Sequence, residues 1–467
     1  MGSRSRARPL TSPADIDRAL ADAQPRVYWL DSEERPVPRP PLTGSASTDL
    51  AIVGGGFSGL WTALLAKERD PNRDVILLEG GRIAWAASGR NGGFCSSSLT
   101  HGEANGRLRY PDEYPTLDRL GCQNLDEIET TVRSRGIACD LRRNGALSVA
   151  TQSHQVAWLR DEPGDFLDRD AVRAEIDSPT YLAGVWERET AMVDPARLAW
   201  GLADAAENAG VRIVEHTPVA ALQLSGRGVR VATPKGDVSA RQVALGTSAF
   251  PSLVRRLRLF TVPVYDYVLV TEPLSSQQRK TIRWHSGAGV SDVTNQFHYY
   301  RMTADGRILW GGYDAIYHFG RHVRATYDQR PATFHRLASH FFETFPQLQG
   351  IRFTHRWGGA IDTCTRFFGF YGSAFSGRVA YALGYTGLGV GASRFGANVM
   401  LDLLDGENTE RTALRSVHER PLPFPPEPFA YAGIQATRWS LAQADRSAGR
   451  RNLWLRSLDR LGLGFDS

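Results

Sequence analysis

A glycine-rich segment near the amino end limits the fold more than any other feature of the chain. Residues 49–59 read Asp-Leu-Ala-Ile-Val-Gly-Gly-Gly-Phe-Ser-Gly, which places the spacing G-x-G-x-x-G on Gly54, Gly56 and Gly59 after an apolar run. The first glycine permits a tight turn, the second lets a phosphate approach the backbone, and the third lets a helix pack on a strand. A helical pattern follows at once, and the amides at its start attract anions. The segment therefore predicts a strand, a turn and a helix that bind a diphosphate.

A second apolar run supports this prediction. Residues 75–78 are Val-Ile-Leu-Leu, and they end in Glu79. In a dinucleotide-binding βαβ unit, an acidic residue at the end of the second strand binds a ribose hydroxyl. The sequence therefore predicts a dinucleotide site that includes Gly54, Gly56, Phe57, Ser58, Gly59 and Glu79.

Two further glycine-rich stretches indicate which dinucleotide is bound. Residues 88–93 read Ser-Gly-Arg-Asn-Gly-Gly, and residues 384–391 read Gly-Tyr-Thr-Gly-Leu-Gly-Val-Gly. A nicotinamide-binding domain completes its cofactor site within its first half, whereas a site that extends from residue 54 to residue 391 must hold a longer molecule. FAD is the long dinucleotide, and we expect it here. The helix that begins near residue 391 would direct its positive end toward the flavin and stabilise the negative charge of the reduced ring.

These three segments together resemble the D-amino-acid oxidase superfamily of FAD-dependent oxidoreductases, within it the gamma-glutamylputrescine oxidase-like branch. The resemblance implies a mixed α/β (α+β) fold, in which a Rossmann-like FAD-binding domain is interwoven with an antiparallel-sheet substrate domain. It also extends the expected cofactor contacts to Ser88, Arg90, Asn91, Gly92, Gly93, Val219, Gly246, Thr247, Trp357, Gly358, Tyr385, Thr386, Gly387, Gly389 and Val390.

On this basis the chain divides into four parts. We expect an N-terminal arm and connector in residues 1–47, and an FAD-binding domain in residues 48–138, 190–255 and 346–410. The substrate domain takes residues 139–189 and 256–345, and a proline-rich strap with a C-terminal basic amphipathic helix takes residues 411–467. Such a helix can lie on an anionic membrane surface. Packing on its own domain or on a second subunit is the interpretation we favour.

The resemblance also bears on the substrate. Amino-acid oxidases of this superfamily carry an arginine in a G-x-R-P-x-T stretch that clamps the substrate carboxylate. The matching stretch here, residues 357–363, has Ile361 at that place. The absence of this arginine favours a small-molecule amine, oxidised at its C–N bond by hydride transfer to flavin N5, with the imine then hydrolysed. O₂ or a quinone would be the final electron acceptor.

Two alternatives stay open at this point. Arg301 or Arg356 could hold a carboxylate instead, which would make the protein an amino-acid or N-methyl-amino-acid oxidase or dehydrogenase. Alternatively, the chain could be a non-catalytic flavin-binding interaction protein whose C-terminal basic helix is the working surface.

Candidate catalytic residues come from expected strands of the substrate domain. On residues 261–271, Tyr265 and Tyr267 share one face and Asp266 lies on the other. On residues 296–301, His298 and Tyr300 lie opposite Tyr299 and Arg301. Aromatic walls suit a cationic amine, and Asp266 or Asp362 could accept its ammonium group. Ordinary sheet packing is the competing interpretation. Our catalytic candidates are His355, Tyr265, Tyr267, His298 and Arg301, with His355 as a base.

Composition excludes several other classes. No run of about 18 apolar residues is present, so no membrane-spanning helix is expected. The four cysteines lack C-x-x-C spacing and indicate reduced thiols in a cytoplasmic protein. Cys364 lies near the region where some relatives tether their flavin, but a buried structural thiol is the better interpretation. Basic and acidic residues alternate, which argues against nucleic-acid binding, and no metal-ligand spacing is found. The protein could be a monomer or a homodimer.

Overall fold

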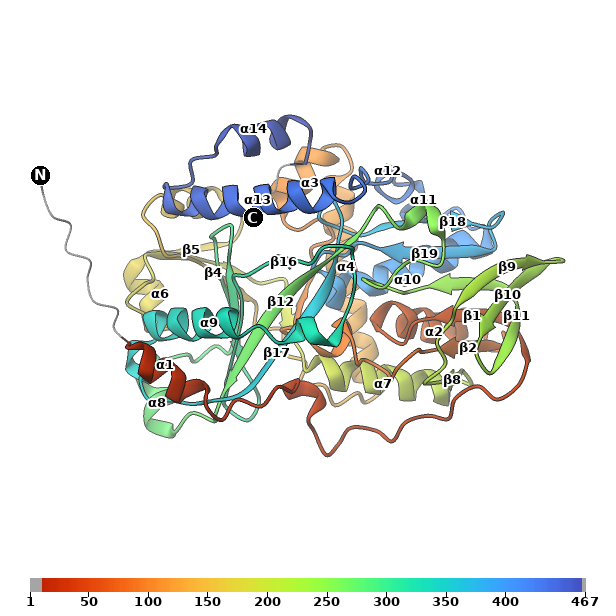
Figure 1. Cartoon of the computed structure of the whole chain (residues 1–467), viewed down its shortest axis with the longest axis horizontal. Helices are drawn as coiled ribbons and strands as arrows, with labels where there is room; N and C mark the ends of the chain where they lie inside the picture. Colours follow the sequence, from red (N-terminus) through yellow and green to blue (C-terminus); the bar gives the residue numbers. More distant parts are fainter. Residues whose placement is uncertain (1–10, 464–467) are drawn as a thin grey trace, which may run out of the picture.

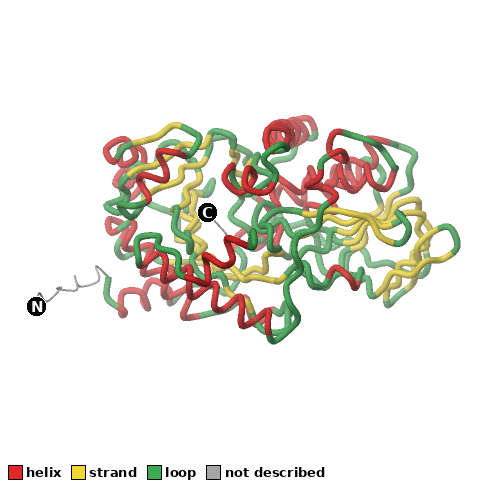
Figure 2. Tube along the Cα trace, turned by 90° about the horizontal axis from the view of Figure 1, so that it is seen from above, coloured by secondary structure: helices red, strands yellow, loops and turns green. Residues whose placement is uncertain are grey.

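The structure, a computed structural model, describes residues 11–463, so the first ten residues of the expected arm and residues 464–467 lie outside it. The described chain has a mixed α/β fold with two large sheets. Figure 1 shows one sheet on each side of the molecule, and in Figure 2 the strands again form two groups.

The first sheet is the nucleotide-binding type that the first glycine segment predicts. Its strands lie in the order β18–β19–β11–β1–β2–β8, and all neighbours except β18 and β19 run parallel. A hairpin of two more strands extends from β11. The bounds are β1 (Ala46–Val53), β2 (Val75–Leu78), β8 (Arg212–Val214), β9 (Ala221–Ser225), β10 (Gly228–Thr233), β11 (Gly236–Leu245), β18 (Phe370–Ala374) and β19 (Val379–Leu383).

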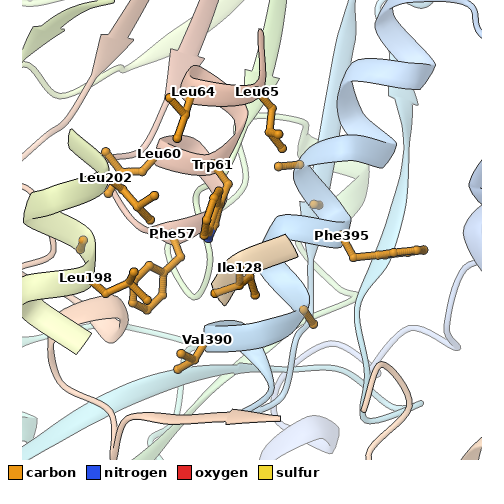
Figure 3. Close-up of a cluster of buried hydrophobic side chains, with 14 of the residues drawn as sticks. Phe57, Leu60, Trp61, Leu64, Leu65, Ile128, Leu198, Leu202, Val390 and Phe395 are labelled. Atoms are coloured by element: carbon orange, nitrogen blue, oxygen red, sulfur yellow. The ribbon is translucent and has the colours of Figure 1, made fainter. Parts of the chain in front are cut away.

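Helix α2 (Phe57–Arg69) is the centre of the core beside this sheet. It packs between α7 (Pro195–Asn208) and α10 (Gly389–Asp405) and is buried along most of its length, with Trp61 fully enclosed. Figure 3 shows its apolar side chains directed toward these neighbours. Gly54 has φ +109°, and a Cβ at Gly59 would lie 1.9 Å from the Gly54 carbonyl oxygen. Both positions therefore require glycine for the turn to form.

The second sheet carries the expected substrate-domain strands. Its order is β16–β12–β15–β14–β13–β4–β6–β5, with β17 also paired to β12, and only β13 and β4 run parallel. The bounds are β4 (Ala146–Ala150), β5 (Asp165–Leu167), β6 (Ala183–Glu187), β12 (Val262–Thr271), β13 (Gly289–Asp292), β14 (His298–Met302), β15 (Ile308–Gly312), β16 (Ile316–Tyr317) and β17 (Phe353–Thr363).

Strand β17 departs from the expected division of the chain. We placed residues 346–410 in the FAD-binding domain, but residues 353–363 pair with β12 along nearly its whole length. The apolar character of a strand does not say which sheet it joins, because both sheets here offer a buried face.

Smaller elements connect and cover the two sheets. A two-stranded sheet joins β3 (Phe94–Ser96) to β7 (Thr190–Met192), and α1 packs on α9. The helices are α1 (Pro13–Leu20), α3 (Glu103–Arg109), α4 (Tyr114–Ser134), α5 (Gln155–Asp161), α6 (Arg169–Glu175), α8 (Ser276–Ile282), α9 (Pro331–Thr344), α11 (Glu410–Ala413) and α12 (Arg415–His418).

The C-terminal segment forms two helices where we expected one. Helix α13 (Phe429–Arg446) ends before Gly449, which has φ +76°, and α14 (Leu453–Arg460) begins with Asn452 as its cap. The Asn452 side chain accepts a hydrogen bond from the Leu455 amide at 3.0 Å. Figure 1 shows both helices lying over the second sheet. In the described part of the chain, none of the helices combines the length and the apolar character needed to cross a membrane.

Candidate functional site

A cavity of about 1610 Å³ extends between the two sheets and beneath α13 and α14. All three glycine-rich segments line it. The expected cofactor residues on its wall are Gly54, Gly56, Phe57, Ser58, Glu79, Ser88, Arg90, Asn91, Gly92, Val219, Gly246, Thr247, Tyr385, Thr386, Gly387, Gly389 and Val390. Segments that are more than 300 residues apart in sequence therefore meet around one space.

Direct hydrogen bonds hold these segments together. The Phe57 amide at the start of α2 donates to Ser88 Oγ at 2.9 Å. Ser58 Oγ lies 3.2 Å from the Tyr385 hydroxyl and donates to it. The first segment is thus joined to the second and to the third by side chains that line the cavity.

Glu79 lies at the carboxyl end of β2, as the sequence predicts. One carboxylate oxygen accepts from the Gly55 amide at 2.6 Å, and the other accepts from the Gly81 amide at 2.6 Å and from Trp85 Nε1 at 2.8 Å. Burial raises the pKa of Glu79, although these donors act in the opposite direction. The contacts fix the carboxylate beside the glycine turn, where a ribose would lie.

The third glycine segment leads into α10. Asp362 Oδ2 accepts from the Gly384 amide at 2.6 Å, and the Thr386 amide donates to the Asp362 carbonyl oxygen at 3.2 Å. The first amides of a helix have no acceptor within it, and the first two residues of α10, Gly389 and Val390, line the cavity. The positive end of α10 is therefore directed into this space.

Two hydroxyl groups on the cavity wall lack a partner. Thr247 Oγ1 and Ser393 Oγ are buried, and neither has a hydrogen-bond partner within residues 11–463. Buried polar atoms are nearly always paired, so these two positions indicate ligand contacts. A long cavity with a glycine turn at the start of a helix, a buried carboxylate and unpaired hydroxyls has the polar groups that a flavin cofactor would need.

Four expected cofactor residues do not line the cavity. Gly59 and Gly93 lie behind the turns they serve. Trp357 Nε1 donates to the Arg90 carbonyl oxygen at 2.9 Å, and the Gly358 carbonyl oxygen accepts from Arg90 Nη1 at 3.0 Å. Trp357 and Gly358 therefore support Arg90 rather than face the cavity themselves.

Comparison with known proteins agrees with this site. Residues 49–403 match the family described as DAO, FAD dependent oxidoreductase. The chain belongs to this family. It is therefore an oxidoreductase that uses a flavin cofactor.

Individual relatives span most of the chain. The chain is 29% identical to gamma-glutamylputrescine oxidoreductase of Escherichia coli, over 85% of this chain and 92% of the relative. It is 25% identical to sarcosine oxidase subunit beta of Rhizobium meliloti, over 72% of this chain and 77% of that protein. Among solved structures, glycine oxidase from Geobacillus kaustophilus has a TM-score of 0.65 at 19% identity, covering 81% of this chain and 100% of that chain.

The catalytic candidates of this flavoenzyme are mostly absent from the cavity wall. Tyr265 lines it, whereas Tyr267, His298, Arg301 and His355 do not. The rings of Tyr265 and Tyr267 belong to the core of the second sheet, where Tyr267 packs edge-on against Phe334 of α9. The alternation along β12 is as expected, but the tyrosine face is the core face.

The other three candidates do not line the cavity and are held by neighbouring groups. His298 Nδ1 lies 2.7 Å from Asp292 Oδ2, and its Nε2 lies 2.9 Å from His340 Nδ1. Arg301 Nη1 donates to the Val193 carbonyl oxygen at 2.6 Å, and burial lowers the pKa of this guanidinium to about 10. His355 Nε2 lies 3.4 Å from Asp31 Oδ2. These contacts indicate structural positions, because each side chain already has its partners.

The opposite face of the same strands presents Asp266 and Tyr299 to the cavity. The Tyr299 hydroxyl donates a short hydrogen bond to Asp266 Oδ2, and the Tyr267 amide donates to Asp266 Oδ1 at 2.8 Å. Burial raises the pKa of Asp266 to about 6. A Cβ at Gly92 would lie 2.7 Å from the Tyr299 ring, so the pair adjoins the second glycine segment.

Arginine is missing from the expected carboxylate position. Ile361 lines the cavity at that place, and Arg301 and Arg356 do not line it. The Arg356 guanidinium lies over the Phe334 ring, 5.7 Å from its centroid. Neither arginine that sequence reasoning offered as an alternative clamp is therefore positioned to hold a substrate carboxylate.

Backbone carbonyl groups surround the Cys364 thiol. The Cys364 thiol is buried, donates to the carbonyl oxygens of Phe368 and Gly384, and does not line the cavity. Within residues 11–463, no group of three or more His, Cys, Asp or Glu side chains could hold a metal ion.

Proposed function

We propose that the chain binds FAD in this cavity and oxidises the C–N bond of a small-molecule amine to an imine, which water then hydrolyses. The observation that carries the proposal is the pairing of Asp266 with Tyr299 on a cavity wall where Ile361 replaces a carboxylate-binding arginine. An acidic group suits an ammonium ion, and Ile361 offers no fork for a carboxylate. The name of one relative, gamma-glutamylputrescine oxidoreductase, also denotes an enzyme of an amine substrate. The name of another, sarcosine oxidase, agrees with the N-methyl-amino-acid alternative, because sarcosine is an N-methyl amino acid.

The cofactor contacts follow from the positions of the three segments. Gly56 and the first amides of α2 would hold the pyrophosphate, Glu79 the ribose, and the start of α10 the pyrimidine edge of the flavin. When bound, the flavin would accept a hydride from the C–H bond next to the amine nitrogen, with O₂ or a quinone as the final electron acceptor.

The protein's own groups prepare the amine for this reaction. Above pH 6 Asp266 is ionised and attracts the incoming ammonium group. Only the neutral amine can lose a hydride, so a proton must leave the nitrogen first. Asp266 Oδ2, which already accepts from Tyr299, is the atom on this wall that can hold that proton. The positive end of α10 would stabilise negative charge that develops on the flavin.

Anaerobic reduction tests the proposal directly. The purified yellow protein is mixed with a panel of primary and N-methyl amines without oxygen, and the flavin absorbance is followed. Bleaching by amines supports the proposal. If amino acids bleach the flavin and no simple amine does, the amino-acid oxidase alternative replaces it. A flavin that no substrate reduces would favour the non-catalytic alternative. Cytoplasmic location and a monomeric or homodimeric state stay predictions.

A further inference from the structure

The two C-terminal helices leave an apolar surface exposed. Helix α13 lines the cavity with residues such as Ile434 and Leu441, whereas Trp439 lies on the opposite side of this helix and is 63% exposed. On α14, Leu453 and Leu461 are 78% and 65% exposed. Large apolar side chains that gather at a surface indicate an interaction site.

A hydrogen bond between the helices brings these side chains together. Asn452 Nδ2 donates to Ser440 Oγ at 2.9 Å. Because Trp439 precedes Ser440 and Leu453 follows Asn452, the exposed tryptophan and the exposed leucine belong to neighbouring segments. Figure 1 shows α14 above α13 at the outside of the molecule. The apolar side chains therefore belong to one surface and are not scattered.

Four exposed arginines accompany this apolar surface. They are Arg446 at the end of α13, Arg450 in the connection, and Arg456 and Arg460 on α14. The ion pairs that residues 429–460 form within the described chain involve other arginines, which are Arg438 and Arg451. We call the four exposed arginines together with Trp439, Leu453 and Leu461 the outer face.

The acidic residues of the two helices do not offset this positive charge. Asp445 Oδ1 accepts from the Asn295 amide at 2.9 Å, and Asp445 Oδ2 accepts from the Gln296 amide at 3.1 Å. Asp459 Oδ1 accepts from Arg451 Nη2 at 2.5 Å. Both carboxylates are thus held by other groups, and the outer face keeps an excess of positive charge.

We propose that the outer face docks the enzyme on a membrane surface that contains anionic phospholipids. Helical spacing places Arg456 and Arg460 along one edge of the strip that Leu453 and Leu461 form on α14. Guanidinium groups at such an edge can bind lipid phosphates while the apolar side chains enter the headgroup region. This inference does not depend on the proposed amine oxidation.

A second copy of this chain fits the outer face less well. In a two-fold symmetric dimer the same surface meets itself, so two sets of arginines would come together without an unpaired acidic residue of α13 or α14 between them. An anionic bilayer supplies the missing negative charge. Docking would also bring the cavity close to the lipid, because the opposite side of α13 lines the cavity.

Vesicle binding by the flavin-containing protein tests this inference. Sedimentation is measured with vesicles of phosphatidylcholine alone and with vesicles of phosphatidylcholine and phosphatidylglycerol in equal parts. One variant combines Arg456→Gln with Arg460→Gln, and another combines Leu453→Ser with Leu461→Ser. None of these four residues lines the cavity, so an unchanged flavin spectrum shows that each variant is folded.

The matched control combines Leu224→Ser with Arg227→Gln. Both residues are exposed, and they belong to the hairpin of β9 and β10 in the first sheet. This control removes the same kinds of side chain from a surface that carries neither α13 nor α14. Light scattering of the wild type and of the variants without vesicles reports whether the outer face joins two copies of the chain.

We expect the wild type to bind the anionic vesicles more tightly than phosphatidylcholine vesicles, and to be released by high salt, because salt screens exposed charges. The double arginine variant should bind the anionic vesicles about 25-fold more weakly, since each basic residue near an anionic surface contributes about fivefold. The double leucine variant should lose about tenfold or more. The hairpin control should bind like the wild type.

Three results would overturn the proposal. The first is equal or absent binding to the two kinds of vesicle. The second is a loss of binding in the hairpin control as large as in the two outer-face variants. The third is a dimer of the wild type that both outer-face variants dissociate, because the outer face would then be an interface between subunits.

Discussion

Replacement of Asp266 by asparagine should have opposite effects on two properties of the protein. It should raise the stability at high pH, relative to the wild type, and it should lower the affinity for amines. Asp266 is enclosed beside the cavity, and burial raises its pKa to about 6 from a usual value of 3.8. Its buried environment therefore disfavours the charged carboxylate as long as no cation is bound beside it. Asparagine keeps the shape of the side chain but never carries the charge.

The size of the effect follows from these two pKa values. A carboxyl group with a pKa of 3.8 in the unfolded chain and about 6 in the folded chain makes folding less favourable by about 3 kcal/mol at a pH where it is ionised in both states. The pKa of Asp266 is higher in the folded chain than in the unfolded chain. The protonated carboxyl group therefore stabilises the folded state fully below pH 4, and this stabilisation is lost as the pH rises through 6. Roughly 2 kcal/mol of this loss falls between pH 4.5 and 8.

The assay compares the free energy of unfolding of the wild type and Asp266→Asn at several pH values, by denaturant titration. The asparagine variant also loses a hydrogen-bond acceptor for Tyr299 or Tyr267, but that cost does not depend on pH. We therefore expect the stability of the variant relative to the wild type to rise by about 2 kcal/mol from pH 4.5 to pH 8. Amine affinity at pH 8 should fall by about tenfold or more.

The control is Asp112→Asn at an exposed position, which should give a stability difference that is constant with pH. A stability difference for Asp266→Asn that stays equally flat would refute the reasoning, because it would mean that Asp266 is not held with a raised pKa. Unchanged amine affinity would refute the second half, the role of Asp266 in substrate binding.

The remaining predictions concern the cofactor. Gly59→Ala places a Cβ 1.9 Å from the Gly54 carbonyl oxygen, so it should destabilise the protein by about 3 kcal/mol or more and yield a colourless product, measured by thermal unfolding and absorbance. Glu79→Gln puts an amide NH₂ against the N–H donors of Gly55 or Gly81 and should weaken FAD binding by about tenfold, measured by flavin fluorescence. Acid precipitation should release all the flavin from the wild type and from Cys364→Ser alike; flavin retained only by the wild type would show a covalent link.

The sequence was sufficient to predict that the three glycine-rich segments meet around one space, because turns that require glycine leave a recognisable spacing. A turn with φ +109° at Gly54 and a backbone contact at Gly59 can be recognised from spacing alone. The acidic residue after β2 has a similarly fixed place. These local constraints explain why widely separated segments could be assigned to one ligand before their positions were known.

The substrate side could not be predicted in the same way. Alternation along β12 correctly separates Tyr265 and Tyr267 from Asp266, but it does not tell which face meets the core. Aromatic residues suit both a pocket and a core, and here α9 covers the tyrosine face. An acidic residue in an otherwise apolar strand was the stronger indication, since carboxylates are rarely enclosed without a partner or a function.

The C-terminal helices posed a different difficulty. The pattern of arginines and apolar residues in residues 431–461 predicted one helix without saying what it covers. Gly449 and the Asn452 cap divide the segment into α13 and α14, and both helices contribute residues to the wall of the cavity. The contacts of Arg438 with Gln435 and with Asp314, which lies between β15 and β16, could not be predicted from this pattern.

Strand β17 shows why the substrate wall and the flavin segment belong to one structural unit. Its pairing with β12 extends from Val262 to Thr271, so it forms part of the sheet that carries Asp266. Near its end, Asp362 binds the Gly384 amide with its side chain and the Thr386 amide with its carbonyl oxygen. Position 361 is thus one residue from the anchor of the third glycine segment. Under the proposed function, a residue there would contact the substrate and the loop before α10 together, and an arginine in place of Ile361 would have to fit both.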